Sequence, residues 1–338
     1  MTVELLWLQL GATAAIILIA SQFLARSADV VAEKTGLGRS FVGVVMLATA
    51  TSLPELGTGI SSIVIVDAPD LAAGDAFGSN LFNLMIIGFL DLYWRNGPVL
   101  NSVRSTSVVV GALGIGLIAL GIGSIYLHHA TTAASSWLLS PVSILLIVGF
   151  LAAMLLIYRH DSNEGSLENQ AEVELNYGDQ GLGRALSIYV TAAIVILVAA
   201  VWLAMTGDHL AEKMGWEASF MGTQFLAIST SLPEIATSFA ALRLQAPDLA
   251  ITNLLGSNVF NMGFVLFFDD LVYSSGAVWG AVSQVHILTG LIAIFMTVIV
   301  IVGVLTRPRS RIGTVWTLEG GALVALYAGA SVLVFTLA

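Results

Sequence analysis

Two stretches of this chain repeat each other: residues 28–55 read ADVVAEKTGLGRSFVGVVMLATATSLPE, and residues 207–234 read GDHLAEKMGWEASFMGTQFLAISTSLPE. They lie 179 residues apart and share AEK, the SF pair and TSLPE in register. A second pair of blocks follows, APDLAAGDAFGSNLFN at 68–83 and APDLAITNLLGSNVFN at 246–261, now 178 residues apart. Self-similarity of this kind indicates that the chain is built from two related halves.

The composition places most of the surface against lipid. Hydrophobic residues make up 57% of the 338 residues, charged residues make up 10%, and the mean hydropathy is +0.92. A soluble domain carries about 25% charged residues because its surface faces water. The chain has no cysteine, which excludes disulfides, thiolate metal sites and cysteine nucleophiles. We therefore expect an all-α integral membrane protein.

Apolar stretches long enough to cross a bilayer recur along the whole chain. A bilayer core about 30 Å thick needs roughly 20 apolar residues in one helix. The segments that meet this length cover residues 5–25, 40–66, 71–94, 105–127, 138–158, 185–205, 218–241, 249–272, 281–305 and 314–337. We therefore predict ten transmembrane helices.

The basic residues predict how these helices are oriented. Of the 12 Lys and Arg residues, all except Lys213 fall in loops that follow an odd-numbered segment. Because basic residues gather in cytoplasmic loops, we expect a multi-pass protein of the cell membrane with both termini outside. An odd number of segments separates the two copies of the repeat, so the second copy is expected to be inserted upside down. Inverted repeats are typical of secondary transporters.

The longest polar stretch divides the chain into its two halves. We predict a first five-helix repeat at 1–158, an acidic cytoplasmic linker at 159–183 and a second, inverted repeat at 184–338. The linker lacks the alternating Asp pattern and the glycine of an EF-hand loop. We therefore expect a solvated linker rather than a calcium sensor.

Two glutamates lie near the centres of predicted spans. Glu55 and Glu234 end the two copies of TSLPE, and a carboxylate at that depth costs about 2.5–3.5 kcal/mol on insertion scales. No basic residue lies inside a predicted span to pair with either one. A protonated glutamate that makes interhelical hydrogen bonds is the structural alternative. Two matched glutamates favour a mobile cation as the partner.

A proline precedes each glutamate. Pro54 and Pro233 lie inside predicted helices, where a proline removes a backbone hydrogen bond and kinks the helix. In a membrane such irregular backbone is tolerated where it faces a partner or a polar cavity. The freed carbonyl groups are expected around residues 48–50 and 227–229.

Hydroxyl and amide side chains surround the glutamates in the same register in both halves. A Thr-Ser pair precedes each glutamate by four and three residues, and each GSN block places a Ser and an Asn four residues apart on one helix face. One hydroxyl of each Thr-Ser pair is expected to bond back to the carbonyl four residues earlier. The side chains of this set are Thr51, Ser52, Ser79, Asn83, Thr230, Ser231, Ser257 and Asn261.

Together these groups offer only oxygen ligands. A set without imidazole or thiol suits hard cations such as Ca²⁺, Na⁺ or Mg²⁺. Flexible carboxylate and carbonyl ligands favour Ca²⁺ over the rigidly octahedral Mg²⁺. Asn80 and Asn258 face elsewhere on their helices, and we expect structural hydrogen bonds from them.

The remaining acidic residues of the spans receive mainly structural interpretations. Asp70 and Asp248 follow prolines and are expected to cap helices. Asp91, Asp269 and Asp270 lie at span ends and need no ion. For Asp75 two interpretations stay open: a charge at an ion entrance, or a hydrated carboxylate at the edge of a cavity.

The paired TSLPE and GSN blocks resemble the two alpha-repeats of the sodium/calcium exchanger family, over the whole ten-helix plan. The resemblance implies alternating access, with extracellular Na⁺ exchanged for Ca²⁺ at one central site. It implies that Glu55 and Glu234 are ligands shared by both ions, and that the carbonyl groups of Ala48 and Ala227 join when Na⁺ loads from outside. The flanking Na⁺ ligands that it implies are Thr51, Ser52, Ser79, Thr230, Ser231 and Ser257.

One position departs from the family pattern. Many relatives carry Asp at the position of Asn261, against Asn at the position of Asn83, whereas this chain has Asn at both. The two glutamates are then expected to be the only ionisable groups at the centre, and one Ca²⁺ balances their charge. We expect Na⁺ and Ca²⁺ to compete for this one site, because holding both would leave uncompensated charge in a low dielectric.

Other classes of protein fit the sequence less well. A channel usually has symmetry about the membrane normal, and an intramembrane enzyme needs a nucleophile and a base, for which the chain offers no cysteine or core histidine. A Ca²⁺/H⁺ antiporter that uses the same glutamate pair stays open, although protons would not require the extra hydroxyl groups. The expected partners are Ca²⁺, Na⁺ and the lipid bilayer, with no cofactor and no nucleic acid, and the oligomeric state is unknown.

Overall fold

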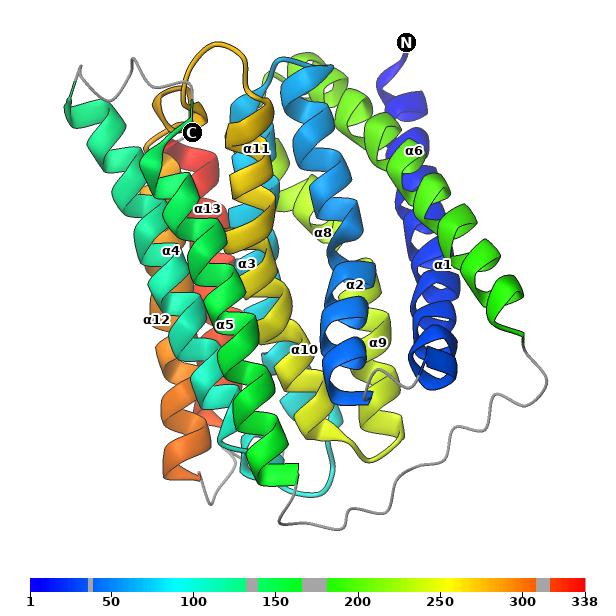
Figure 1. Ribbon diagram of the computed structural model, residues 1–338. Helices are drawn as coiled ribbons and strands as arrows, with labels where there is room; N and C mark the ends of the chain where they lie inside the picture. The colour runs from blue at the N-terminus through cyan, green and yellow to red at the C-terminus, as the bar shows by residue number, and fades with distance from the viewer. Residues whose placement is uncertain (36–38, 132–138, 166–180, 308–316, 338) are drawn as a thin grey trace.

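The protein is a bundle of helices, shown in Figure 1 as a computed structural model. The structure describes residues 1–35, 39–131, 139–165, 181–307 and 317–337. Within these ranges every regular element is a helix, and none of the described residues forms a strand. The all-α expectation is therefore confirmed for the described part of the chain.

The first half consists of long helices joined by short connections. Helix α3 begins at Pro69, whose fixed backbone angle suits the first turn of a helix. The elements of this half are α1 (Val3–Thr35), α2 (Arg39–Val64), α3 (Pro69–Tyr93), the 3-10 turn η1 (Val99–Ser102), α4 (Thr106–Ala130) and α5 (Pro141–Gly165).

The second half contains more breaks. Two of its long apolar runs are divided by π-helical turns, η3 and η4, which insert an extra residue into a helix. The elements are α6 (Leu182–Met214), α7 (Ala218–Met221), η3 (Gly222–Leu226), α8 (Ala227–Thr230), α9 (Leu232–Arg243), α10 (Pro247–Phe260), η4 (Asn261–Val265), α11 (Leu266–Val272), η5 (Val278–Gly280), α12 (Val285–Thr306) and α13 (Leu318–Leu337).

Many of these helices are apolar enough to cross a membrane. Seven of the described helices are long and apolar enough to span a membrane. The number is eight if the bent pair Ala218–Thr230 and Leu232–Arg243 forms one span. The described apolar part of α5, Pro141–Ile157, is shorter. The chain is a multi-pass helical membrane protein. The count of ten crossings and their division into two repeats stay predictions.

The two helices that flank the predicted linker extend into it. Helix α5 continues to Gly165 and α6 begins at Leu182, so the ends of the predicted linker 159–183 are helical. Residues 166–180, with most of the acidic stretch, lie outside the described residues.

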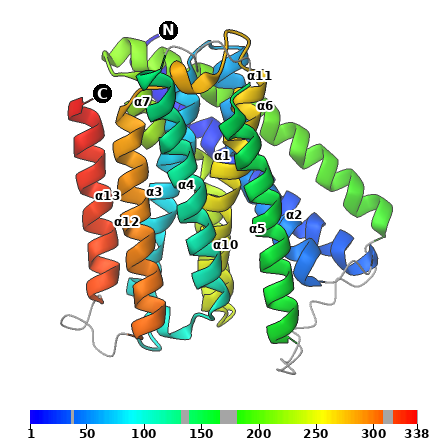
Figure 2. The same cartoon turned by 60° about the vertical axis from the view of Figure 1, so that its left-hand side comes forward.

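The helices α3 and α10 form the buried centre of the bundle. In an apolar stretch of 18 residues, 78% of the residues are buried in α3 and 72% in the run from α10 to α11, against 22% in α13. Helix α1 packs along α6 at one side of the bundle, while α12 and α13 lie at the other side (Figures 1 and 2). Both chain ends lie at the same end of the bundle (Figures 1 and 2).

Candidate cation site

The two TSLPE motifs adopt different backbones. Helix α2 runs through Pro54 without interruption. In the second half α8 ends at Thr230, α9 begins at Leu232, and the two helical segments meet at 43°. Pro233 lies in the first turn of α9, where its missing N–H leaves no helical bond unmade. The predicted disruption therefore occurs at Pro233, whereas α2 is not divided at Pro54.

The two predicted glutamates meet in the centre, and each contacts a serine of the opposite half. Glu55 is 1% exposed and Glu234 is 0% exposed. The Ser231 hydroxyl donates to Oε1 of Glu55 at 3.1 Å, and the Ser52 hydroxyl donates to Oε1 of Glu234 at 3.4 Å. Because Ser52 and Ser231 occupy matching places in the two motifs, these contacts are reciprocal.

The threonines of the motifs and the serines of the GSN blocks form a second reciprocal pair of contacts. The hydroxyl oxygens of Thr51 and Ser257 are 3.5 Å apart, and those of Ser79 and Thr230 are also 3.5 Å apart. Ser257 donates in addition to Oε1 of Glu234 at 3.1 Å. The Thr230 hydroxyl also lies 3.1 Å from the carbonyl oxygen four residues earlier, within reach of the back-bond that was predicted for one hydroxyl of each Thr-Ser pair.

Four asparagines form a third reciprocal arrangement. Nδ2 of Asn83 donates to Oδ1 of Asn258 at 3.0 Å, and Nδ2 of Asn261 donates to Oδ1 of Asn80 at 3.5 Å. The structural hydrogen bonds expected of Asn80 and Asn258 are therefore present. In Asn83 and Asn261 these bonds use the amide nitrogen and leave the amide oxygen for another partner.

Several buried oxygens of this cluster have no hydrogen-bond partner among the described residues. They are Oε2 of Glu55, Oε2 of Glu234, Oδ1 of Asn83 and Oδ1 of Asn261. An unmet buried acceptor costs about 1–3 kcal/mol, and more when it is charged. A hard cation among these oxygens would satisfy several of them at once. No three His, Asp or Glu side chains cluster as a metal centre in the described part, so a cation here would also need hydroxyl or amide ligands.

The main-chain carbonyl groups that the family resemblance implies as ligands are less available to a cation than the side-chain oxygens. The carbonyl of Ala227 accepts the N–H of Ser231 at 3.1 Å and lies 3.3 Å from the Thr230 hydroxyl. It is therefore not freed by Pro233, contrary to the prediction. Ala48 lies in the part of α2 whose side chains are outside the described set, and its role stays a prediction.

Asp75 is the aspartate for which the sequence left two interpretations open, and the structure excludes one of them. It is 1% exposed rather than hydrated at a cavity edge. Its Oδ1 accepts the Thr230 hydroxyl at 2.9 Å, and its Oδ2 has no partner among the described residues. The prediction that Glu55 and Glu234 are the only ionisable groups at the centre is therefore wrong, because a third carboxylate touches the cluster.

The acids at the span ends differ from one another. Asp91 accepts the main-chain N–H groups of Val99 and Thr317, both at 2.9 Å. Asp270 accepts two main-chain N–H groups in the corresponding places, at 2.6 and 2.8 Å. Asp269, in contrast, is 1% exposed, and neither of its carboxylate oxygens has a partner among the described residues. The structural interpretation fits the first two acids and leaves Asp269 unexplained.

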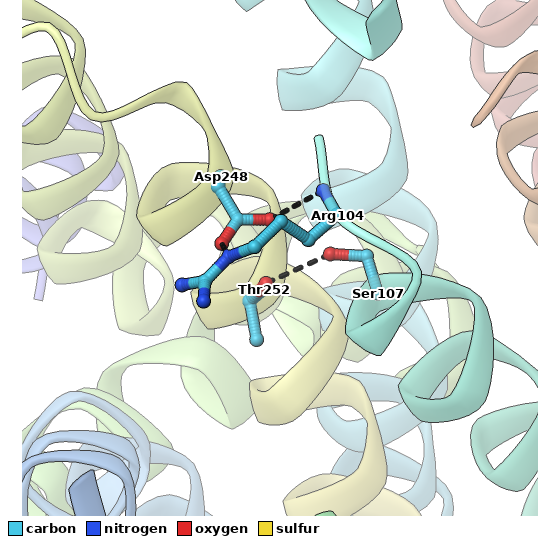
Figure 3. A network of polar contacts seen from close by, with 4 residues as sticks. All are labelled: Arg104, Ser107, Asp248 and Thr252. Atoms are coloured by element: carbon cyan, nitrogen blue, oxygen red, sulfur yellow. Dashed lines mark hydrogen bonds and ion pairs between the residues drawn. The ribbon is translucent and has the colours of Figure 1, made fainter. Parts of the chain in front are cut away.

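Asp248 connects the two halves at the start of α10. Its carboxylate accepts the main-chain N–H of Arg104 at 2.8 Å and pairs with Nε of the same residue at 2.7 Å (Figure 3). Beside this pair, the hydroxyls of Ser107 and Thr252 are 2.8 Å apart (Figure 3). The first turn of α4 is thus attached to the first turns of α10.

Asp70 makes the corresponding contact at the start of α3. Its carboxylate accepts the main-chain N–H of Ser283, just before α12, at 2.5 Å. The structure shows no side-chain cap at the start of α3 or α10. The prediction that Asp70 and Asp248 cap their own helices is therefore wrong, because each carboxylate binds the main chain of the opposite half.

Known proteins resemble this chain in both sequence and fold. Inner membrane protein YrbG of Escherichia coli (strain K12) is 26% identical over 246 residues, 73% of each chain. Sodium/calcium exchanger MaX1 of Methanosarcina acetivorans is 22% identical over 288 residues, 75% of this chain and 79% of the relative. A solved structure of the sodium-calcium exchanger NCX_Mj shares the fold, with a TM-score of 0.60 at 17% identity over 97% of this chain and 98% of that chain.

A family model confirms the resemblance seen in the repeated motifs. The model for Sodium/calcium exchanger protein matches residues 5–159 and again residues 184–336, which together make up most of the chain. The two matched segments contain the first and second copies of TSLPE and GSN, respectively. The chain therefore belongs to the sodium/calcium exchanger protein family.

Proposed function

We propose that this protein is a secondary active antiporter that exchanges Na⁺ for Ca²⁺ across the cell membrane at one central, shared site. The observation that carries the proposal is the glutamate pair. Glu55 and Glu234 are buried, come from opposite halves, and each keeps an oxygen without a partner among the described residues. Two carboxylates so placed would be balanced by one Ca²⁺ or by two Na⁺, which is the charge relation that an exchanger needs.

The hydroxyl and amide groups around the pair would complete the coordination. Ca²⁺ takes six to eight oxygen ligands in flexible geometry, more than two carboxylates supply. The open amide oxygens of Asn83 and Asn261 support a ligand role for them. The carbonyl of Ala227 could join only after releasing its bond to Ser231. The further ligands that we assign are Thr51, Ser52, Ser79, Thr230, Ser231, Ser257 and the carbonyl of Ala48.

We also propose that residues 1–158 and 184–338 are inverted repeats joined by the linker 159–183. The reciprocal contacts support this. Each of these contacts between a residue of the first half and a residue of the second half has a matching contact between their two counterparts. The Glu–Ser, Thr–Ser and Asn–Asn contacts all follow this rule. Both chain ends lie at one end of the bundle (Figure 1), which requires an even number of crossings and is compatible with ten.

Alternating access would then follow because two inverted repeats can exchange conformations, which opens the site to one side of the membrane and then to the other. The motif helix of one half is continuous while that of the other is broken. In a transporter built from inverted repeats, the two halves exchange such roles as the site changes the side on which it opens. This supports a cycle in which the same cluster loads Na⁺ from one side and Ca²⁺ from the other.

The basic residues support the expected orientation. The α3–α4 and α9–α10 connections lie at the end of the bundle opposite both termini (Figure 1). Arg95 and Arg104 lie in the first connection, and Arg243 is the last residue of α9, next to the second. By the rule for basic residues this end is cytoplasmic. Because the chain has no native cysteine, Arg95→Cys and Lys213→Cys can be labelled singly from outside cells. Labelling at Lys213→Cys alone is expected, and labelling at Arg95→Cys alone would reverse the assignment.

Ion flux tests the proposed function. The purified protein is placed in vesicles, the pH is clamped to the same value on both sides, and uptake of radioactive Ca²⁺ is followed under an imposed Na⁺ gradient. Ca²⁺ uptake should rise with outward Na⁺ gradients and stop when the gradient is abolished. Uptake that ignores Na⁺ and follows an imposed pH gradient would reject the proposal in favour of a Ca²⁺/H⁺ antiporter.

A further inference from the structure

Asp269 is a buried carboxylate that no contact in the described part of the chain satisfies. It is 1% exposed, and neither of its carboxylate oxygens has a hydrogen-bond partner among the described residues. Its neighbour Asp270 and Asp91 of the first half each accept two main-chain N–H groups instead. An ionisable side chain inside a membrane helix is costly, and such residues mark ion pathways in transport proteins. The position of Asp269 therefore calls for a partner from outside the chain.

The Asp269 carboxylate lies against the face of α2 that carries Glu55. A Cβ atom added at Gly59 would lie 2.5 Å from Oδ1 of Asp269 and 2.9 Å from its Oδ2. Gly59 follows Glu55 by four residues, so the two positions lie on the same helix face. The missing side chain of Gly59 thus leaves room for the Asp269 carboxylate about one helical turn beyond the central glutamate.

Two hydroxyl groups continue this face of α2. Thr58 and Ser62 are both 0% exposed, and neither hydroxyl oxygen has a partner among the described residues. Because the side chains of a helix lean toward its N-terminus, Ser62 covers the turn of Gly59 and Thr58 covers the turn of Glu55. Oε2 of Glu55 is likewise without a partner among the described residues. These oxygens and the Asp269 carboxylate form a row along about 10 Å of α2.

The row leads from the central site toward one end of the bundle. Helix α2 ends at Val64, and α11, which carries Asp269, packs beside α2. Both elements lie at the end of the bundle that holds the two chain termini (Figure 1). A cation that leaves or reaches Glu55 from this end passes the Asp269 carboxylate first.

The second half has no such row among its described residues. At the places of Thr58, Gly59 and Ser62 it has Thr237, Ser238 and Ala241. Ser238 has a side chain where Gly59 leaves room, and the Thr237 hydroxyl donates to the main-chain carbonyl four residues earlier at 2.9 Å. The acid of the corresponding region, Asp91, is occupied by main-chain N–H groups. The described residues therefore provide a row of open oxygens on one side of the central site only.

We propose that Asp269, with the hydroxyls of Thr58 and Ser62, holds a hard cation on its way between the central site and the membrane face at which both termini lie. This entry station rests on the proposed function, because the glutamate pair is the destination of the cation. One carboxylate and two hydroxyls are fewer ligands than the six to eight oxygens that Ca²⁺ takes, so the ion keeps part of its water shell and is passed on. A carboxylate beside the path raises the local cation concentration and the rate of arrival. Opening of the central site toward the termini exposes the row to water.

Ca²⁺ uptake from each face of the membrane tests this proposal. Right-side-out and inside-out membrane vesicles are prepared from cells that make the wild type or Asp269→Asn, and labelling of Lys213→Cys in parallel preparations identifies the vesicles whose termini face the medium. Initial Na⁺-driven uptake of radioactive Ca²⁺ is measured across a series of Ca²⁺ concentrations. With the termini facing the medium, Asp269→Asn should raise the half-saturating Ca²⁺ concentration about tenfold. In the opposite orientation it should match the wild type.

Two further variants sharpen this measurement. Gly59→Ala keeps the charge of Asp269 but places a Cβ atom where the carboxylate lies, so it should cause the same one-sided change. Glu4→Gln removes an exposed acid at the start of α1, outside the row, and should leave uptake from both faces unchanged. A change in Glu4→Gln as large as that in Asp269→Asn would reject the entry station, because the general surface charge would then account for the effect.

Equilibrium binding of radioactive Ca²⁺ to the purified full-length protein is the second readout. Asp269→Asn should bind Ca²⁺ with the affinity of the wild type, because Asp269 is no ligand of the central site, and this binding also reports that the variant has folded. A weakened equilibrium affinity, an equal change of uptake from both faces, or no change from either face would each reject the entry station and leave the shared glutamate site standing. A wild type without Na⁺-driven uptake from either face would overturn the proposed function together with the entry station.

Discussion

The same five residues, TSLPE, lie in an unbroken helix in the first half and across a break in the second. Helix α2 passes through its proline, whereas the backbone leaves the helical path at Ser231, and a π-helical turn, η3, precedes the break. Both copies nevertheless bring a glutamate, a serine and a threonine into the same central cluster. The motif therefore determines the chemistry of the site, while the packing around each copy determines its backbone.

The helices that face the two motifs account for part of this difference. On α3, Gly74 and Gly78 lie directly against the backbone of α7 and η3, and a Cβ atom added at Gly74 would lie 2.9 Å from the carbonyl oxygen of Ser219. On α10 the corresponding positions are Thr252 and Gly256, and no described residue lies within 4 Å of a Cβ added at Gly256. Among the described residues, the π-helical turn thus packs against a surface of α3 that α10 does not reproduce.

Removing either central carboxylate should have the largest effect and should affect both halves alike. Glu55→Gln and Glu234→Gln each delete one of the two charges that hold Ca²⁺, and the remaining glutamate cannot supply both. Each variant should lose Na⁺-driven Ca²⁺ uptake in vesicles while still inserting in the membrane. Glu4→Gln, at an exposed position at the start of α1, is the matched control and should keep normal uptake. Near-normal uptake by one of the central variants would show that only one half provides the charge.

The two serines of the TSLPE motifs, Ser52 and Ser231, should matter to a smaller and equal degree. Ser52→Ala and Ser231→Ala each remove one hydrogen bond to a buried carboxylate, which is worth about 1.5–3 kcal/mol. The apparent Ca²⁺ affinity should therefore weaken about tenfold or more in each variant. Thr306→Val, at an exposed position near the end of α12, serves as the control. A strong effect at one serine and none at the other would contradict the reciprocal site.

Glycine substitutions should separate the two halves. At Gly78 an added Cβ would collide with the backbone of Thr223, so Gly78→Ala should destabilise the protein by about 1–3 kcal/mol. Gly256→Ala should leave stability nearly unchanged or raise it slightly, because alanine favours a helix. Thermal unfolding of the two variants in detergent measures the difference. Equal losses of stability would show that α10 is packed as tightly as α3.

The sequence alone was sufficient for the helices and for the pairing of the glutamates. Long apolar runs indicate helices that face lipid. A carboxylate inside such a run is unusual, so Glu55 and Glu234 could be identified without the structure. The repeat also predicted serines and asparagines near both glutamates, whereas the structure was needed to show which of these residues contact each other across the two halves. The predicted features depend on the hydrophobic periodicity and the composition of short stretches of sequence, which can be seen without knowing how the chain folds.

The roles of the aspartates depended on details of backbone geometry and helix packing that no short sequence pattern indicates. At the 178-residue spacing of the GSN blocks, Asp91 corresponds to Asp269. The π-helical turn η4 inserts one residue, so Asp270 takes the matching place and binds the main chain instead. Asp75 is buried because α7 and η3 pack closely on α3, and that contact involves backbone geometry of the second half.

Competition between the two ions tests the central claim most directly. Equilibrium binding of radioactive Ca²⁺ to the purified protein is measured across a series of Na⁺ concentrations, at constant pH and ionic strength. If Glu55 and Glu234 form one shared site, the apparent Ca²⁺ affinity should fall steadily as the Na⁺ concentration rises. A Ca²⁺ affinity that stays the same at every Na⁺ concentration would contradict the shared site.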